Sequence, residues 1–266
     1  MVKGLYIAHN GMVNEMRRLD IMANNLANAD TTAYKKEGTT SVTFADELAY
    51  RIKDTSSYGH TKKVGGISYV TQIGQVYTDY SSGSFKVTDN ETDFAIEGDG
   101  FFAVSFTDKE GNTSVKFTRD GNFVVNTEGY LVTKDGDYVL NATGALNMDP
   151  SEANYIQVDP LAALSVNELG YIYQNDEIVG TLGLVDFENY DYLEKYGENM
   201  YNLVEGGTIM ASEAGVRQGM LETSNVNVVN EMVNMITIQR AYDAGQKVIT
   251  STDETLGIAV KLGKVK

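Results

Sequence analysis

The sequence predicts an α+β protein in which the N- and C-terminal helices form one discontinuous coiled-coil domain and the middle of the chain forms an all-β domain. Apolar residues recur every seven positions at both ends of the chain, a spacing typical of coiled-coil seams. Between the ends, short runs rich in Val, Ile, Phe and Tyr are separated by Asp-Gly pairs, which favour tight turns. The 266 residues, 42% of them hydrophobic, are enough to build a core.

The N-terminal helix of the coiled-coil domain is expected within residues 1–36. Neither Pro nor Gly occurs between Met12 and Glu37, and about 22 helical residues would span roughly 33 Å. Its predicted seam, which we expect to contact other subunits, consists of Leu5, Met12, Leu19 and Leu26.

The stretch "NNLANADTTAYKK" (24–36) is unusual for the end of a helix because it holds three asparagines within five positions. Asn favours caps and turns over helix interiors, and a helix cap would account for one of the three. We therefore expect Asn24, Asn25 and Asn28, with Tyr34, to make polar contacts at a subunit interface.

Residues 37–75 are polar and rich in Ser, Thr and Gly, and we expect a connecting arm that is partly helical around Phe44 to Arg51. Residues 76–216 are expected to form the β-rich outer domain. Within it, Asp120-Gly121 and Asp135-Gly136 predict hairpin turns, because both residue types tolerate the positive φ that tight turns need.

The remaining residues, 217–266, are assigned to the C-terminal helix, which could run for about 35 residues or roughly 52 Å. Polar Gln239, Gln246 and Asp253 interrupt its seam, and polar seam residues typically specify register and partner. Ordinary amphipathic helices that pack on the β domain are the alternative, but the length of the helix and these polar positions favour contacts with several neighbours. The predicted seam and subunit interface consists of Val228, Met235, Tyr242, Ile249 and Leu256.

Charge is distributed unevenly along the chain, whose net charge is −16. Residues 1–36 hold five basic and three acidic side chains, residues 217–266 hold six and five, and the middle holds ten and 29. Because like charges repel in a crowded assembly, self-association is expected at the nearly neutral ends. The acidic total argues against nucleic acid as a partner. No apolar run approaches the ~18 residues of a membrane span, so the protein is not expected to be integral to a membrane.

Catalytic, cofactor-binding and metal sites are not predicted. The chain has no Cys and only two histidines, His9 and His60, so a Ser-His-Asp triad or a His-rich metal site has little to build on. "EGDGFF" lacks the third glycine or Gly-Lys of a nucleotide-binding loop. A secreted acidic β-domain enzyme or carbohydrate-binding module with a helical oligomerisation stalk stays an alternative class.

Three motifs resemble the axial proteins of the bacterial flagellum, the rod and hook family. "ANNLANADTTAYKK" (23–36) is similar to their N-terminal signature, which reads Ala-Asn-Asn-Leu-Ala-Asn followed by Thr-x-Gly-Phe/Tyr-Lys. "DFAIEGDGFFAV" with "FTRDGNF" resembles the start of their β domain, and "GMLETSNVNVVNEMVNMITIQRAYDAGQKVI" (219–249) their C-terminal signature. Ala33 departs from the pattern, since the family usually has Gly there.

The resemblance implies a structural subunit of the basal-body rod and no enzymatic activity. It implies a helical polymer of the chain with itself that forms a hollow shaft, contacts with other rod and hook proteins, and extracytoplasmic delivery by the flagellar type III export apparatus. Distal-rod members look most similar, proximal-rod members next, and hook protein less so because it normally carries a larger outer insertion. In the free monomer, we expect the terminal seams to be partly disordered because they lack neighbours.

Overall fold

The computed structural model describes residues 2–51, 62–197 and 199–263, and the chain divides into two compact units. The helical unit comprises Met1–Ala27, Lys36–Asp79 and Asn227–Lys266. The β unit comprises Asn28–Lys35 and Tyr80–Val226. The chain therefore begins in the helical unit, enters the β unit for one short segment, returns, and repeats this exchange once more.

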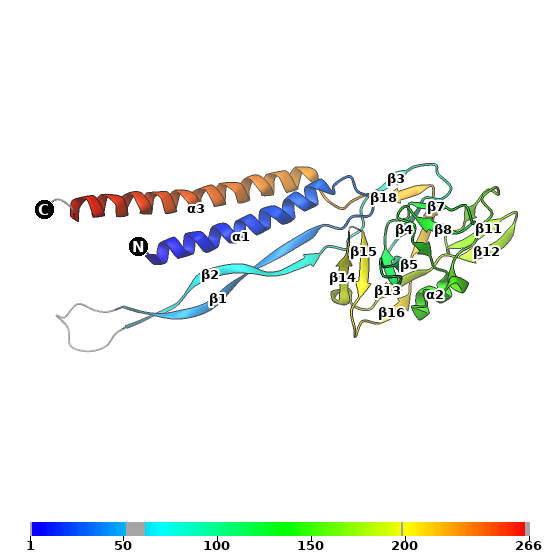
Figure 1. Ribbon diagram of the computed structural model, residues 1–266, viewed down its shortest axis with the longest axis horizontal. Helices are drawn as coiled ribbons and strands as arrows, with labels where there is room; N and C mark the ends of the chain where they lie inside the picture. The colour runs from blue at the N-terminus through cyan, green and yellow to red at the C-terminus, as the bar shows by residue number, and fades with distance from the viewer. Residues whose placement is uncertain (1, 52–61, 198, 264–266) are drawn as a thin grey trace. The chain divides into compact units, whose positions relative to one another are not determined.

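The helical unit contains α1 (Val2–Ala27), α3 (Val228–Gly263) and a hairpin of β1 (Glu37–Arg51) and β2 (Lys62–Thr78). The two helices lie side by side (Figure 1). They are antiparallel, since Gly245 lies against Met12, whereas Asn234 shares a groove with Met22. The long terminal helices and the α+β class are thus confirmed.

Two boundaries in the helical unit differ from the sequence-based expectation. The prediction of helix around Phe44 to Arg51 was wrong. Strand β1 runs through Arg51 and pairs antiparallel with β2 from Glu37↔Thr78 to Arg51↔Lys62. Backbone pairing with a distant segment overrides the local helix propensity of "ADELA". The C-terminal helix begins only at Val228, because the residues just after 217 belong to strands of the β unit.

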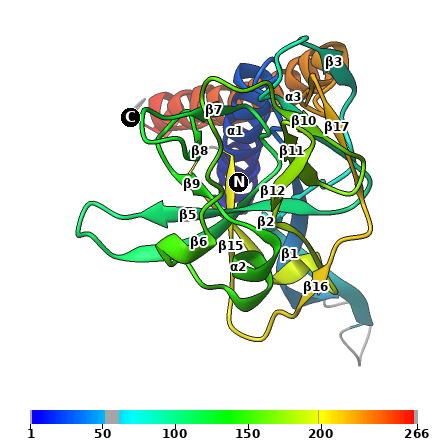
Figure 2. The ribbon, with the colours of Figure 1, turned by 90° about the vertical axis from the view of Figure 1, so that its right-hand side faces the viewer.

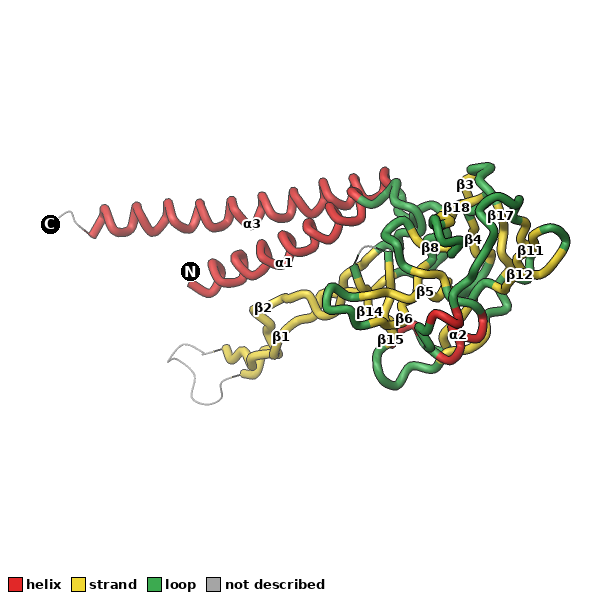
Figure 3. The backbone as a smooth tube through the Cα atoms, turned by 45° about the vertical axis from the view of Figure 1, so that its right-hand side comes forward, coloured by secondary structure: helices red, strands yellow, loops and turns green. Residues whose placement is uncertain are grey.

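The β unit is built on a nine-stranded sheet in the order β14-β15-β6-β5-β9-β8-β7, with β13 joining β5 to β16. Three smaller sheets, β10-β11-β12, β17-β4 and β18-β3, complete it. Figure 2 shows β5 beside β6, with which it pairs over most of its length. Figure 3 shows that strands and loops dominate this unit, with a short helix α2 (Ala142–Asn147) and 3₁₀ turns at Glu152–Asn154 and Tyr190–Tyr192.

The strands of the β unit are short. Their bounds are β3 Phe85–Val87, β4 Phe94–Glu97, β5 Phe101–Thr107, β6 Thr113–Thr118, β7 Phe123–Val125, β8 Leu131–Thr133, β9 Tyr138–Val139, β10 Ser165–Val166, β11 Tyr171–Gln174, β12 Glu177–Thr181, β13 Leu184–Phe187, β14 Leu193–Tyr196, β15 Met200–Leu203, β16 Ile209–Ala211, β17 Gly215–Gln218 and β18 Met220–Glu222.

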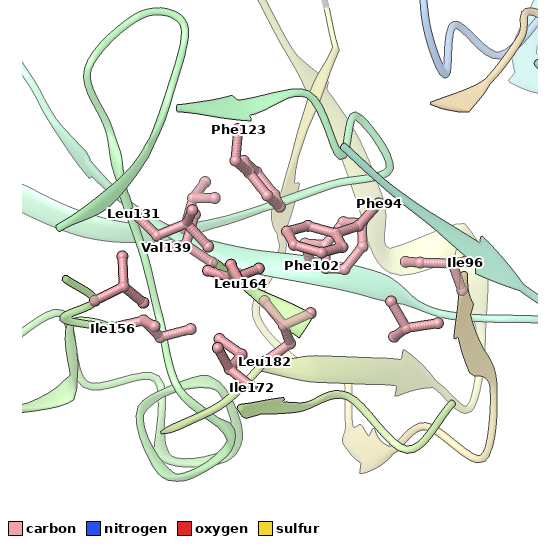
Figure 4. Packing of buried hydrophobic residues seen from close by; sticks show 13 residues of the cluster. Phe94, Ile96, Phe102, Phe123, Leu131, Val139, Ile156, Leu164, Ile172 and Leu182 are labelled. Atoms are coloured by element: carbon pink, nitrogen blue, oxygen red, sulfur yellow. The ribbon is translucent and has the colours of Figure 1, made fainter. Parts of the chain in front are cut away.

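Two apolar clusters form the core of the β unit. In one, the rings of Phe94, Phe102 and Phe123 meet, with centroids 5.3 Å apart for Phe102 and Phe123 (Figure 4). In the second, the ring of Phe187 contacts the rings of Phe101 and Phe117. Aromatic packing of this kind lets a sheet of short strands bury a large apolar area.

The two Asp-Gly pairs have different roles. Asp135-Gly136 forms the expected turn of a hairpin, between the paired strands β8 and β9. The prediction of a hairpin at Asp120-Gly121 was wrong, because the strands on either side of it, β6 and β7, are not neighbours in the sheet. Gly121 instead lies against the backbone of Phe94, whose carbonyl oxygen a Cβ would strike, and its own carbonyl accepts from the Phe94 N–H at 2.9 Å.

Candidate functional site

The facing side of α3 is buried against α1 along a heptad spacing. Met235, Tyr242 and Ile249 from the predicted seam are partly buried, and Ile238 and Glu231 are 3% and 2% exposed. On α1, the predicted seam residues are partly buried as well: Leu5, Met12, Leu19 and Leu26. These seam positions are therefore at least partly buried within one chain.

Gly245 sets how closely the two helices approach. A Cβ at this position would lie 2.7 Å from Cγ of Met12, and carbon atoms normally stay at 3.5–4.0 Å. The glycine thus allows the Met12 side chain to lie directly on the α3 backbone, although Gly lowers helix propensity.

The opposite side of α3 is apolar at its beginning and exposed. Four side chains there follow i, i+3, i+4 and i+7 spacing, which places them on one face: Val229 (64% exposed), Met232 (44%), Val233 (56%) and Ile236 (53%). We call them the outward stripe. The seam's end residues Val228 and Leu256 are also exposed, at 39% and 40%. The first turns of α3 are therefore apolar on two faces, of which α1 covers one.

The asparagines of the N-terminal signature divide between the two units. Asn25 is fully buried, and its amide pairs with the backbone of Glu37: Nδ2 donates to the carbonyl at 2.8 Å, and the N–H donates to Oδ1 at 3.0 Å. The Asn25 side chain thus makes the two backbone hydrogen bonds at Glu37, the first residue of β1, that a neighbouring strand would otherwise make. Asn28 accepts from the Thr31 hydroxyl at 3.1 Å in a turn, and the side chain of Asn24 is exposed.

Residues 28–35 are held inside the β unit. Tyr34 is 2% exposed, and Nζ of Lys195 lies 4.2 Å from its ring centroid. The Thr32 hydroxyl donates to Oδ2 of Asp120 at 3.0 Å. Burial raises the pKa of the Asp120 carboxyl, although hydrogen bonds from the Asn122 backbone and the Thr32 side chain oppose this effect. Residues 28–35 of the signature are therefore part of the β unit's own structure.

The next residue, Lys35, belongs to a buried charged cluster with Arg119 and Glu222. Lys35 Nζ donates to Oε1 of Glu222 at 2.7 Å, and neither side chain is exposed. Arg119 Nη1 lies 3.4 Å from the same oxygen, while Nε and Nη2 of Arg119 donate to the carbonyls of Gly100 and Gly98 at 2.9 and 2.6 Å. Buried charges of this kind persist only when paired and hydrogen-bonded.

The charged cluster joins the three motifs quoted above. Lys35 comes from the N-terminal signature, Arg119 from "FTRDGNF", and Glu222 from the C-terminal signature. Sequence reasoning missed this cluster, because no residue spacing relates positions so far apart. The available signal was that each of the three motifs contains one of these charged residues.

Two further features are absent from the part of the chain that the structure describes. No group of three or more His, Cys, Asp or Glu side chains within residues 2–51, 62–197 and 199–263 is placed to hold a metal ion. In the same ranges, no helix is both long enough and apolar enough to cross a membrane. The arrangement offers an exposed apolar helix face and a buried cluster that joins the segment after α1 to the segment before α3.

Comparisons with known families match three parts of the chain in order. Residues 5–35 match the family described as "Flagella basal body rod protein", and residues 95–174 match "Flagellar hook protein FlgE/F/G D1 domain". Residues 217–262 match "Flagellar basal body rod FlgEFG protein C-terminal". The three matches cover both terminal signatures and the opening of the β unit.

Similar proteins extend over essentially the whole chain. Flagellar basal-body rod protein FlgG of Bacillus subtilis is 33% identical over 275 residues, which cover 98% of this chain and 99% of the relative. Flagellar basal-body rod protein FlgF of Caulobacter vibrioides is 34% identical over 268 residues and the full length of both chains. FlgG of Buchnera aphidicola subsp. Schizaphis graminum is 34% identical over 96% of this chain and 98% of its own.

Proposed function

The chain belongs to the family of flagellar basal-body rod proteins, and from this premise we propose that it is a structural subunit of the rod that polymerises through its terminal helices. Relatives named FlgG and FlgF match with similar identity, so the proposal concerns the rod and not a position along it. The function is packing and transmission of torque through a shaft, without catalysis.

The observation that carries the proposal is the outward stripe of α3. Its four apolar side chains are 44–64% exposed, and exposed apolar side chains that gather on one face mark sites of protein association. A neighbouring copy of the chain can cover this stripe while α1 covers the opposite seam. Contacts of this kind, in which one face of a subunit meets a different face of the next, build open helical filaments.

Several finer features belong to the same proposal. The α1–α3 pair is a coiled coil that continues into contacts with neighbours. Of the predicted interface residues, the exposed Asn24, Val228 and Leu256 can make such contacts directly, whereas the buried Asn25 and Tyr34 stabilise the chain itself. The helical polymer is hollow, joins other rod and hook proteins, and receives its subunits through the flagellar type III export apparatus. It lies in the basal body, outside the cytoplasm. The acidic residues between 37 and 216 support an outward, hydrated position for the β unit.

A charge placed in the outward stripe tests the proposal. In Ile236→Asp, an ionised carboxylate would have to lose its hydration in the interface between copies, which is strongly unfavourable. We expect this variant to stay monomeric at concentrations where the wild type sediments as a polymer. Circular dichroism of the tyrosines should show an unchanged melting transition of the β unit.

Ser251→Asp is the matched control, because it adds the same charge to the same helix beyond the outward stripe, at an exposed position. This control should polymerise. Polymers of Ile236→Asp that form at the wild-type concentration would contradict the proposal, as would an Ile236→Asp variant whose β unit no longer melts cooperatively.

A further inference from the structure

A cavity of about 520 Å³ opens in the β unit. Its walls come from residues 31–32, from β5 and β6, from the turn between β8 and β9, and from β14, β15 and the residues that join them. All of these segments belong to the β unit, and none of the three residues of the charged cluster lines the cavity. Because a water molecule takes up about 30 Å³ of the liquid, the cavity can hold a side chain or a ligand of similar size.

The lining of the cavity is acidic. Among the described residues that line it are three carboxylates, those of Asp120, Asp135 and Asp137, and one ammonium group, that of the exposed Lys134. Burial raises the pKa of the Asp120 and Asp137 carboxyls, and the charge of Asp135 raises the pKa of Asp137 further. A raised pKa means that the negative form lacks full compensation from its surroundings. A positively charged group in the cavity would supply it.

Hydrogen-bond acceptors in the wall also lack donors. Asn199 donates from Nδ2 to the carbonyl of Thr32 at 2.9 Å, which leaves its Oδ1 as an acceptor. That oxygen is buried and has no hydrogen-bond partner among the residues that the structure describes. Asp120 accepts from the Thr32 hydroxyl at 3.0 Å and from the Asn122 N–H at 3.1 Å, but a carboxylate has about four acceptor positions. A ligand with several N–H donors would satisfy these atoms.

An aromatic wall completes the cavity. The rings of Phe106 and Tyr196 meet edge to face with their centroids 5.2 Å apart, and Tyr196 is 40% exposed. Nζ of Lys116 lies 4.4 Å from the centroid of the Tyr196 ring, so this ring already makes one cation–π contact. Tyrosine rings also stack with planar cations, and Tyr196 brings such a ring to the cavity.

We propose that the cavity binds a guanidinium group, presented as an arginine side chain by a protein partner. Guanidinium is always charged, carries five N–H donors in one plane and stacks on aromatic rings. It therefore matches the carboxylates, the unpartnered Asn199 oxygen and the Tyr196 ring together. An ammonium group has fewer donors and holds its water more strongly, and a neutral sugar brings donors but no positive charge. The inference goes beyond the proposed function, because the cavity is contained in the β unit of one chain.

The test titrates the full-length protein, below the concentration at which it polymerises, with a blocked Ala-Arg-Ala tripeptide. In NMR spectra, the backbone amides of Thr32, Asn122 and Asn199, which line the cavity, should shift. A peptide with citrulline in place of arginine has nearly the same shape without the charge. We expect it to bind at least about tenfold more weakly, because hydrogen bonds between charged groups are the stronger ones. A lysine peptide should also bind more weakly than the arginine peptide.

Two substitutions in the wall change the charge of the cavity in opposite directions. Asp137→Asn keeps the shape and removes a negative charge, so we expect about tenfold weaker binding of the Ala-Arg-Ala peptide. Lys134→Met removes the competing positive charge and should strengthen binding about threefold. Because Lys134 is exposed, this variant carries the test even if Asp137→Asn lowers the stability of the β unit. Glu177→Gln is the matched control, since it neutralises an exposed carboxylate outside the cavity lining and should leave binding unchanged.

The results that would overturn the inference are distinct. Equal binding of the arginine and citrulline peptides would do so, as would equal binding of the arginine and lysine peptides. Weaker binding in Lys134→Met would show that the cavity does not select a cation. An arginine peptide that shifts none of the cavity amides would also reject the inference, and shifts caused instead by the neutral trisaccharide cellotriose would identify a carbohydrate site. None of these results depends on polymerisation, so each leaves the proposed function intact.

Discussion

At the residue scale, Ala33 is the clearest source of local strain in the signature. Its φ is +55°, in the left-handed region, and it is 3% exposed. This conformation costs an L-residue about 1–2 kcal/mol, whereas Gly adopts it freely at an entropic cost of about 0.5–1 kcal/mol. We expect Ala33→Gly to stabilise the β unit by up to about 1 kcal/mol, measured by urea denaturation.

Ala95→Gly is the matched control for that measurement. Ala95 is fully buried in β4 and is not among the residues with positive φ. There, Gly loses buried contacts and gains no relief of strain, so the β unit should become less stable. A loss of stability in Ala33→Gly similar to that in Ala95→Gly would contradict the account of strain.

The asparagines show which contacts can be predicted from single residues in the sequence and which cannot. Three Asn residues in a helical stretch predicted polar contacts at a subunit interface, which stays a prediction. Within the chain, Asn25 makes two hydrogen bonds with the backbone of Glu37. The partner could not be predicted, because it depends on a strand that local propensity did not favour. The charged cluster could not be predicted either, because Lys35, Arg119 and Glu222 are far apart in the sequence and meet only in the folded chain.

At the element scale, the close approach of α1 and α3 at Gly245 can be tested directly. Gly245→Leu would place a branched side chain at a position where even a single added Cβ would lie only 2.7 Å from Cγ of Met12. Although Leu favours helix over Gly, we expect the helices to separate. Amides of α1 should then exchange with solvent at least about tenfold faster, because they lose the packing on which most helical stability depends.

The same substitution at Gly257 supplies the control, because nothing lies within 4 Å of a Cβ at that position of α3. Gly257→Leu should leave α1 exchange unchanged and make α3 slightly more helical. Equal effects of the two substitutions on α1 would show that helix propensity, and not the contact with Met12, governs the pair.

Elements defined by a periodic pattern were predicted well, and elements defined by distant pairing were not. The seven-residue spacing predicted a C-terminal helix of about 35 residues, and α3 has 36. "ADELA" carries good helix formers, yet it lies in β1, because its backbone hydrogen bonds go to β2. Sequence spacing reports which face a helix buries, whereas it contains no information on which remote strand an extended segment will meet.

At the scale of the whole molecule, the acidic excess lies in the middle of the chain, whereas exposed apolar side chains are frequent along α3. Residues 37–216 hold 29 acidic and ten basic side chains, whereas each end is within two charges of neutrality. The ends also carry the outward stripe and, further along α3, exposed Ile258, Val260 and Leu262. Under the proposed function, association through α3 buries apolar side chains on a segment that is close to neutral.

The exposed end of α3 predicts uneven stability in the free monomer. Leu256, Ile258, Val260 and Leu262 are 40–71% exposed in the last turns of α3, and helical turns without packing are marginal in water. In hydrogen exchange on the monomer, we expect residues 256–263 to exchange almost without protection, residues 5–27 and 228–249 to show intermediate protection, and β5 and β6 to be the most protected. Polymerisation should protect both helices. Strong protection across 5–27 and 228–260 in the monomer would show that the helices are stable without neighbours and that assembly does not order them.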